Sequence, residues 1–368
     1  MSKSYEERMR ESLMAQYTGS KGGDPKPAKP EPTSPALKLF NPPSKTRKGM
    51  VEFKTIVGEA HEDGKKHYWP AAIQHKDTDW PELMRGRIPE KHDRHIPDHA
   101  YCEDILDALA FDKVLKAVGD PGSGKDTTIK WLCGILRIPY VREDGSEGKE
   151  AQDIVGYATP DTSGGYNEYP ALLTLFVKHG GVYVDSEPDV NTPGTNMCKQ
   201  HLQEDERIFK FQGHPDPEQA QIKAHKDFRL LMTSNTRGTG DDAGMFTATM
   251  AQDVSSINRV DIHSTVSYLP PEKEVLLVMK NVDGVTEAFA KKMVQMGVLM
   301  RNAWRNGDDD ACVGIPFSPR QLLAWGEKAV RMGEPVKGFK QCYYNALDDV
   351  EKDFARKCWE DVDFGCSL

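Results

Sequence analysis

Several kinds of segment are missing from this 368-residue sequence, and their absence narrows the classes of protein to consider. No apolar run approaches the ~20 residues that a membrane-spanning helix needs, and the N-terminal residues are too polar for a secretory signal peptide. The seven cysteines are scattered and include no C-x-x-C pair, which argues against a disulfide framework and a zinc site. The eleven histidines show no metal-ligand spacing, and we expect the three that lie close together at the surface (His92, His95 and His99). These absences predict free thiols and a cytoplasmic location.

An excess of positive charge is also missing from most of the chain. The formal net charge is -9, yet residues 1–50 hold ten Lys and Arg against five Asp and Glu, so the remainder carries about -14. Nucleic-acid binding needs a basic surface, so we expect no direct contact with nucleic acid. The basic N-terminal segment is either a solvated linker or a contact for an acidic partner.

Composition and patterning divide the chain into four parts. Residues 1–48 combine a possible short amphipathic helix at 4–17 with a stretch that holds seven prolines, and we expect a disordered basic tail that tethers a docking peptide. Residues 49–95 form a small lead-in with a strand predicted over residues 51–57. We assign residues 96–270 to a nucleotide-binding α/β domain and residues 271–368 to a helical lid with the C-terminal helices.

A glycine-rich loop is the most informative motif. Residues 119–127 read Gly-Asp-Pro-Gly-Ser-Gly-Lys-Asp-Thr, between an apolar run at 114–118 and a helical pattern at 127–136. Strand, glycine loop and helix are the context of a Walker A motif, in which backbone N–H groups and the helix N-terminus bind a triphosphate. The alternative is a structural turn. We predict an ATP site made by Gly119, Asp120, Pro121, Gly122, Ser123, Gly124, Lys125, Asp126 and Thr127, with Lys125 on the β/γ oxygens.

The residue after the lysine departs from the motif. It is normally Ser or Thr, whose hydroxyl binds Mg²⁺, and here it is Asp126. A carboxylate is a good ligand for Mg²⁺, but it brings negative charge towards the phosphates. Either Asp126 binds the metal, directly or through water, or Thr127 takes over this role.

A second acidic motif follows a buried strand. Residues 180–185 are an apolar run that ends on Asp185, the natural Walker B aspartate and Mg²⁺ ligand. Ser186 stands where the catalytic glutamate is usual, and Glu187 comes next. A one-residue bulge would aim Glu187 at the attacking water; the alternative is that Glu187 points elsewhere and hydrolysis is slow or absent. Further on, Asn235 ends another apolar strand, where a polar side chain can sit between the carboxylates and the γ-phosphate.

The remaining pattern predicts the fold. Strands are expected at 114–118, 140–142, 181–185, 228–233 and 261–268, with helical patterns in the intervals. Alternating strands and helices favour a five-stranded parallel sheet. Helical segments follow at 272–280, 285–305, 319–332 and 345–360, and they indicate a small all-helical lid.

Taken together, these motifs resemble the ATPase subunit of aerobic cobaltochelatase (CobS) and, more broadly, the MoxR-type group of AAA+ ATPases. The resemblance covers roughly residues 93–332. Its matching segments, in order, are 93–97, 119–125, 153–156, 185–189, 233–241, 257–259, 264–270 and 318–320 with Trp325.

The resemblance implies further roles. Arg259 would be an arginine finger that reaches the γ-phosphate of a neighbouring subunit, which makes a homo-oligomer, a hexameric ring, the expected state. Arg320 would be the sensor 2 arginine of the lid. Asp126, Ser186 and Asn258 depart from the family pattern, and all three bear on the rate of hydrolysis rather than on nucleotide binding.

The leading hypothesis is a ring-forming ATPase that uses Mg²⁺ and ATP to remodel or load a partner protein. The resemblance implies a partner subunit with a von Willebrand-type domain, while the client stays unidentified. A second hypothesis is a nucleotide-binding structural or assembly protein whose hydrolysis is slow or lost. A nucleotide kinase, suggested by Gly-Lys-Asp, leaves Asn235, Arg259 and Arg320 without a role.

Overall fold

The computed structural model describes residues 48–211, 214–238, 240, 248–306 and 313–368. The helix predicted over residues 4–17 and the proline-rich stretch after it lie outside this part of the chain. No helix in the described part is both long and apolar enough to span a bilayer.

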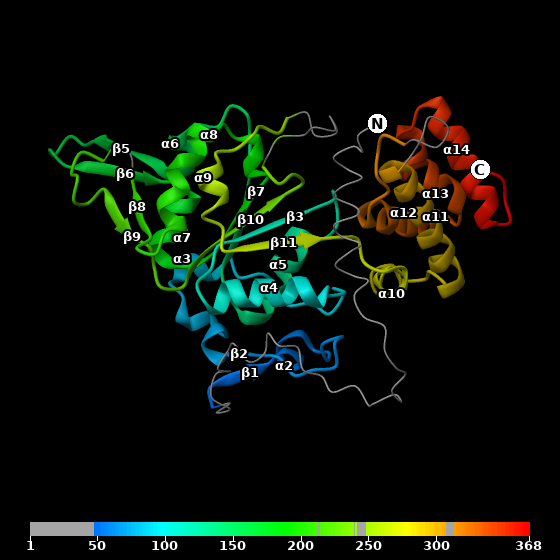
Figure 1. The fold of residues 1–368 in the computed structure, drawn as a ribbon, viewed down its shortest axis with the longest axis horizontal. Helices are drawn as coiled ribbons and strands as arrows, with labels where there is room; N and C mark the ends of the chain where they lie inside the picture. Colours follow the sequence, from blue (N-terminus) through cyan, green and yellow to red (C-terminus); the bar gives the residue numbers. More distant parts are fainter. Residues whose placement is uncertain (1–47, 212–213, 239, 241–247, 307–312) are drawn as a thin grey trace, which may run out of the picture. The chain divides into compact units, whose positions relative to one another are not determined.

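A five-stranded sheet forms the centre of the fold, with the strand order β11-β3-β10-β7-β4 and only parallel pairs (Figure 1). Its strands are β3 (Leu115–Gly119), β4 (Tyr140–Asp144), β7 (Gly181–Ser186), β10 (Phe228–Ser234) and β11 (Ile262–Val266). Interior strands of a parallel sheet are buried on both faces, which explains the near-continuous apolar runs. The predicted α/β fold and its five strands are confirmed.

The strand register decides which side chains share a face of the sheet. Two neighbouring cross-strand rows are Lys116–Met232–Asp185 and Ala117–Thr233–Ser186. Successive side chains of a strand point to opposite faces, so these two rows lie on opposite faces. Helix α5 (Lys125–Leu136) packs on the face of Thr233, because Asp126 in its first turn accepts a hydrogen bond of 2.7 Å from the Thr233 hydroxyl.

Helices and short antiparallel pairs surround the sheet. The main helices are α4 (His99–Ala110) and α7 (Leu172–His179). Shorter elements are α6 (Ala151–Val155), β5 (Gly156–Pro160), β6 (Tyr166–Pro170), η4 (Pro188–Val190), α8 (Pro193–Asn196), η5 (Met197–Gln203), β8 (Ile208–Lys210), β9 (Gln221–Lys223) and α9 (Val254–Ile257). β5 and β6 form a hairpin that follows α6 directly.

The N-terminal described segment packs on the same core as the sheet. Its elements are β1 (Met50–Glu52), α2 (Phe53–Val57), β2 (Tyr68–Pro70), η2 (Ala71–Ile73), η3 (Asp77–Asp79) and α3 (Glu82–Arg85). The strand predicted over residues 51–57 is wrong beyond Glu52, because Phe53, Ile56 and Val57 are buried at helical spacing and Gly58 caps the helix at φ 96°. Trp69 and the sheet belong to one continuous core, so we propose that residues 49–95 are part of the α/β domain.

The expectation of three surface histidines is also wrong. Only His92 is exposed. His99 is 4% exposed, and its Nε2 lies 2.6 Å from Glu59 Oε1. Burial lowers the pKa of His95 to about 4.

The C-terminal helices build a second hydrophobic core of their own. They are α10 (Pro271–Asn281), α11 (Glu287–Asn306), α12 (Pro319–Met332), α13 (Pro335–Cys342), η6 (Tyr344–Ala346) and α14 (Asp349–Val362) (Figure 1). Trp325 lies at its centre, fully buried against Phe317, Phe339 and Trp359. The helical lid is confirmed, although α13 was not predicted. The separate core supports a domain boundary at Pro271, which we propose.

Candidate nucleotide site

The glycine loop joins β3 to α5 at the carboxyl edge of the sheet. Gly122 and Gly124 have positive φ angles of 74° and 95°, which glycine adopts without strain. A Cβ on Gly119 would collide with the Val266 carbonyl oxygen of the neighbouring strand. The loop therefore has the backbone that a phosphate-binding turn requires, and its glycines are needed for conformation and for close packing.

Lys125 lies in the interior of this loop, with only 6% of its surface exposed. Its Nζ donates hydrogen bonds to the carbonyl oxygens of Gly119 (2.6 Å) and Asp120 (3.2 Å) and to Asn235 Oδ1 (3.0 Å). Burial lowers the pKa of Lys125, and the nearby Glu187 and Asp126 oppose that effect. The structure thus brings Lys125, the predicted Walker A lysine, into direct contact with Asn235, the polar residue predicted near the γ-phosphate.

Glu187 lies on the same side of the sheet as Lys125. Its backbone is left-handed, at φ 51° and ψ 49°, an unusual conformation for a residue with a side chain. The Glu187 N–H donates to the Thr233 carbonyl oxygen (2.6 Å), and its Oε2 accepts a hydrogen bond of 3.2 Å from the Asn235 N–H. Burial raises the pKa of this carboxyl, although the Asn235 N–H and the charge of Lys125 lower it. The turn after Ser186 therefore brings the Glu187 carboxylate to the Asn235 N–H, where the charge of Lys125 acts on it.

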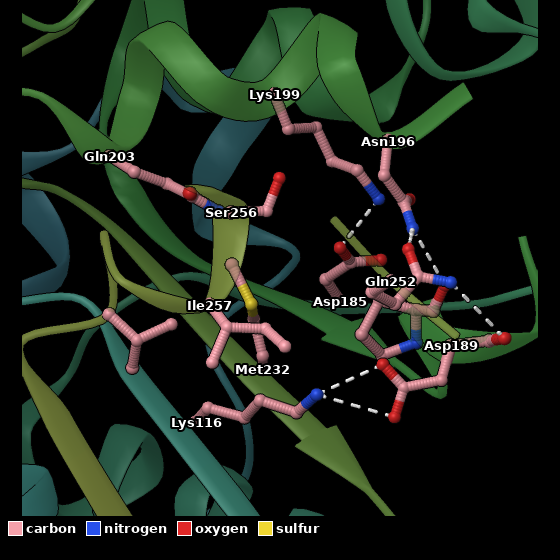
Figure 2. A pocket seen from close by; sticks show the side chains of 12 residues that line it. Lys116, Asp185, Asp189, Asn196, Lys199, Gln203, Met232, Gln252, Ser256 and Ile257 are labelled. Atoms are coloured by element: carbon pink, nitrogen blue, oxygen red, sulfur yellow. Dashed lines mark hydrogen bonds and ion pairs between the residues drawn. The ribbon is translucent and has the colours of Figure 1, made fainter. Parts of the chain in front are cut away.

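Asp185 lies on the opposite face of the sheet, away from α5. Its Oδ2 lies 2.5 Å from Lys199 Nζ, and the two side chains are 4% and 3% exposed. Figure 2 shows this pair in a small pocket that also holds the ion pair between Lys116 and Asp189, 2.9 Å apart. The structure does not bring Asp185 together with the glycine loop. Its observed position therefore does not fit the predicted role of a Mg²⁺ ligand.

Asp126 lies in the first turn of α5, directly after Lys125. Its Oδ1 accepts the hydrogen bond from Thr233, and its Oδ2 lies 3.8 Å from Arg142 Nε. The charges of Asp126 and Glu187 both raise the pKa of Lys125. Thr127, the alternative ligand, is exposed at the mouth of the nucleotide cavity. Asp126 and Glu187 are thus the carboxylates that could hold a divalent cation next to Lys125.

A cavity of about 300 Å³ opens beside the loop. Residues 122–128 line one wall, and Arg320 from the first turn of α12 lines another. Its apolar wall is made by Ile96, Val266, Leu269, Leu277 and Leu323. Sequence reasoning missed this wall, because its residues come from segments far apart and carry no motif of their own.

Two contacts tie the helical domain and its connection to the loop, and a third joins the two side chains that make them. Arg305 forms an ion pair with Asp120, and the Tyr268 hydroxyl donates a hydrogen bond of 2.8 Å to the Pro121 carbonyl oxygen. The Arg305 guanidinium lies 5.4 Å from the centre of the Tyr268 ring. Movement of the helical domain would therefore pull on the loop that carries Lys125.

Arg259 follows α9 and lies outside its own nucleotide cavity. Its Nη1 donates to the Ser255 carbonyl oxygen (2.8 Å), and its Nε lies 3.4 Å from Glu204 Oε1. The side chain is 32% exposed. It is therefore accessible at the surface and makes no described contact with residues 119–127.

The loop between β3 and α5, the partner carboxylate and asparagine, and the helical domain on a five-stranded parallel sheet define a P-loop ATPase of the AAA+ class. No protein-family model matches the chain. The chain is, however, 28% identical over 305 residues to "Aerobic cobaltochelatase subunit CobS" of Sinorhizobium sp., and the match covers 79% of this chain and 89% of that protein. The chain is thus similar to this CobS subunit over most of the length of both proteins.

Solved structures with similar arrangements include the RuvB Holliday junction branch migration motor of Thermotoga maritima. It has 15% identity and a TM-score of 0.43, over 74% of this chain and 72% of that chain. A point mutant of the same protein has 12% identity and a TM-score of 0.45, over 74% of this chain and 73% of that chain.

Proposed function

We propose that this chain is a ring-forming ATPase that binds Mg²⁺ and ATP and couples hydrolysis to remodelling or loading of a partner protein. The observation that carries the proposal is the position of Glu187, whose carboxylate meets the Asn235 N–H beside Lys125. A partly buried carboxylate with a raised pKa at this position is suited to take a proton from an attacking water.

The residues around the loop fit the nucleotide and its metal. The ammonium of Lys125 and the loop N–H groups would hold the phosphates, and the apolar wall with Ile96 and Leu277 would hold the base. Asp126 would hold Mg²⁺, directly or through water, which leaves the Glu187 carboxylate to act as the base. Bound Mg²⁺ supplies charge neutralisation at the β and γ oxygens, while Asn235 orients Glu187.

The proposal of a ring rests on the position of Arg259. An exposed arginine that its own site does not use fits a role at the site of a neighbouring copy. Arg320 would contact the nucleotide from the lid. Glu204 would then release Arg259 when the neighbouring copy docks.

The CobS relative is named as one subunit of an aerobic cobaltochelatase. We propose a cytoplasmic motor that acts on a separate subunit, such as one with a von Willebrand-type domain, without assigning cobalt chemistry to this chain. An acidic body without a basic footprint fits a protein client better than nucleic acid.

A second function is favoured by two observations at the Walker B position. Ser186 replaces the usual glutamate, and Asp185 is held by Lys199 instead of facing the loop. In this alternative, ATP is a structural ligand that stabilises an assembly, and its hydrolysis is slow or lost.

Phosphate release and ATP binding, measured in parallel, separate the two functions. If the chain is a motor, the wild type should release phosphate, and Glu187→Gln should release it about 10²–10⁴-fold more slowly while it still binds ATP. Lys125→Ala should lose both ATP binding and phosphate release. A wild type that binds ATP yet releases no more phosphate than Lys125→Ala would establish the structural alternative.

A further inference from the structure

Two histidines from one loop meet a glutamate on helix α4 of the nucleotide domain. His61 and His67 lie in the loop between α2 and β2, and Glu103 lies on α4. His67 Nδ1 is 2.7 Å and His61 Nε2 is 3.5 Å from the same Glu103 oxygen. The three ligand atoms all lie within 4.8 Å of one another.

Asp63 holds the other nitrogen of each imidazole. Its Oδ1 is 2.8 Å from His61 Nδ1, and its Oδ2 is 3.0 Å from His67 Nε2. Metal-binding histidines commonly donate their second ring N–H to a carboxylate, which fixes the tautomer and the ring orientation. Where each imidazole donates its second N–H to Asp63, the two remaining nitrogens, His61 Nε2 and His67 Nδ1, offer their lone pairs on the side of Glu103; the Asp63 backbone N–H also lies 3.3 Å from His61 Nδ1.

The His61 ring carries the most specific signal. Its side chain is only 8% exposed, and its Nε2 is buried without a hydrogen-bond partner among the described residues. Buried polar atoms are nearly always satisfied, so this nitrogen calls for a partner. Phe53, with its ring centre 5.1 Å from that of His61, keeps the imidazole in place.

We propose that this cluster binds Zn²⁺ through His61 Nε2, His67 Nδ1 and Glu103 Oε1, with water at the fourth position. Two imidazoles and one carboxylate are a recognised zinc donor set, with Zn–N and Zn–O bonds of about 2.0–2.2 Å. Mg²⁺ prefers oxygen ligands, so imidazole donors disfavour it. His67 and Glu103 are 29% and 27% exposed, which gives the ion an entry path and room for water.

The bound ion would cross-link the α2–β2 loop to α4. Helix α4 begins beside the nucleotide cavity, which Asp98 lines, and the Tyr101 hydroxyl donates a hydrogen bond of 3.2 Å to the Lys125 carbonyl oxygen. The zinc would therefore stabilise the wall of the nucleotide domain. The sequence concealed the site, because Glu103 lies 36 residues after His67.

The test is the zinc content of the full chain, purified without a histidine tag and dialysed, by elemental mass spectrometry. We expect about one zinc per chain in the wild type and in His92→Ala, an exposed histidine outside the cluster, and less than about a tenth in His61→Gln and in Glu103→Gln. Lys125→Ala should retain its zinc, which excludes binding at the phosphate loop.

Thermal unfolding gives a second readout. Added Zn²⁺ should raise the unfolding midpoint of the chelator-treated wild type, on the order of 5 °C, and leave that of His61→Gln unchanged. Glu103→Gln, at a more exposed position, tests the site if His61→Gln fails to fold. Zinc contents and Zn²⁺-induced shifts that are equal in the wild type and both cluster variants would overturn the proposal.

Discussion

Asp185→Asn separates a structural ion pair from a metal ligand. The structure pairs Asp185 with Lys199 at 2.5 Å, with both side chains at least 96% buried. Removing one partner of a buried pair leaves an uncompensated charge, which destabilises proteins by about 3–5 kcal/mol. The asparagine can still accept a hydrogen bond from Lys199, so we expect a loss near the lower limit, about 3 kcal/mol, in the free energy of unfolding.

Urea unfolding of four proteins measures this value: wild type, Asp185→Asn, Lys199→Met, and the double variant Asp185→Leu with Lys199→Met. The double variant should recover most of the stability, because apolar side chains of similar volume replace a buried pair at little or no loss. Wild-type stability in Asp185→Asn, together with a large rise in the Mg²⁺ needed for turnover, would refute the reasoning and restore Asp185 as the metal ligand.

The other predictions concern the nucleotide cavity. Arg320→Ala should weaken ATP binding about 10–100-fold, as expected for a lost charged hydrogen bond, whereas Arg331→Ala on the same helix should not; equal affinities would remove Arg320 from the site. Asp126→Asn should raise the Mg²⁺ concentration for half-maximal turnover, and an unchanged value would exclude Asp126 as a ligand. Because the pKa of His95 is lowered from 6.5 to about 4, the unfolded chain binds the proton between these values, so stability should fall as the pH drops below 6.5. By about pH 5, the free energy of unfolding of the wild type, measured with urea, should have fallen by about 2 kcal/mol relative to that of His95→Gln. Parallel pH profiles of the two proteins would contradict the lowered pKa of His95.

The sequence predicted the sheet well, because buried parallel strands are continuous apolar runs that end in recognisable polar residues. It also predicted that Lys125 and Asn235 both serve the phosphate site, but not their direct hydrogen bond, which the structure adds. The helix at Phe53 was missed, because a stretch of five residues with three apolar side chains fits either a strand or a helix until its packing partner is known.

The sequence did not predict on which face of the sheet Asp185 lies. Regular alternation would place Asp185 and Glu187, which are two residues apart, on the same face of the sheet. The left-handed turn at Glu187 breaks that alternation and separates the two carboxylates. Nothing in the sequence before Lys199 indicated that this lysine, 14 residues later, would pair with Asp185. The apolar wall of the cavity was hidden for the same reason, since it is assembled from distant segments.

Mixing two inactive variants tests the central claim, an ATP site completed by the neighbouring copy. Lys125→Ala should lose nucleotide but keep its Arg259, and Arg259→Ala should bind nucleotide but lack the finger, so each alone should release almost no phosphate. In an equal mixture, about a quarter of the sites would pair an intact loop with an intact neighbouring arginine. We predict recovery of phosphate release on that order, whereas a mixture as inactive as its two components, with wild-type chain turning over normally, would contradict the account.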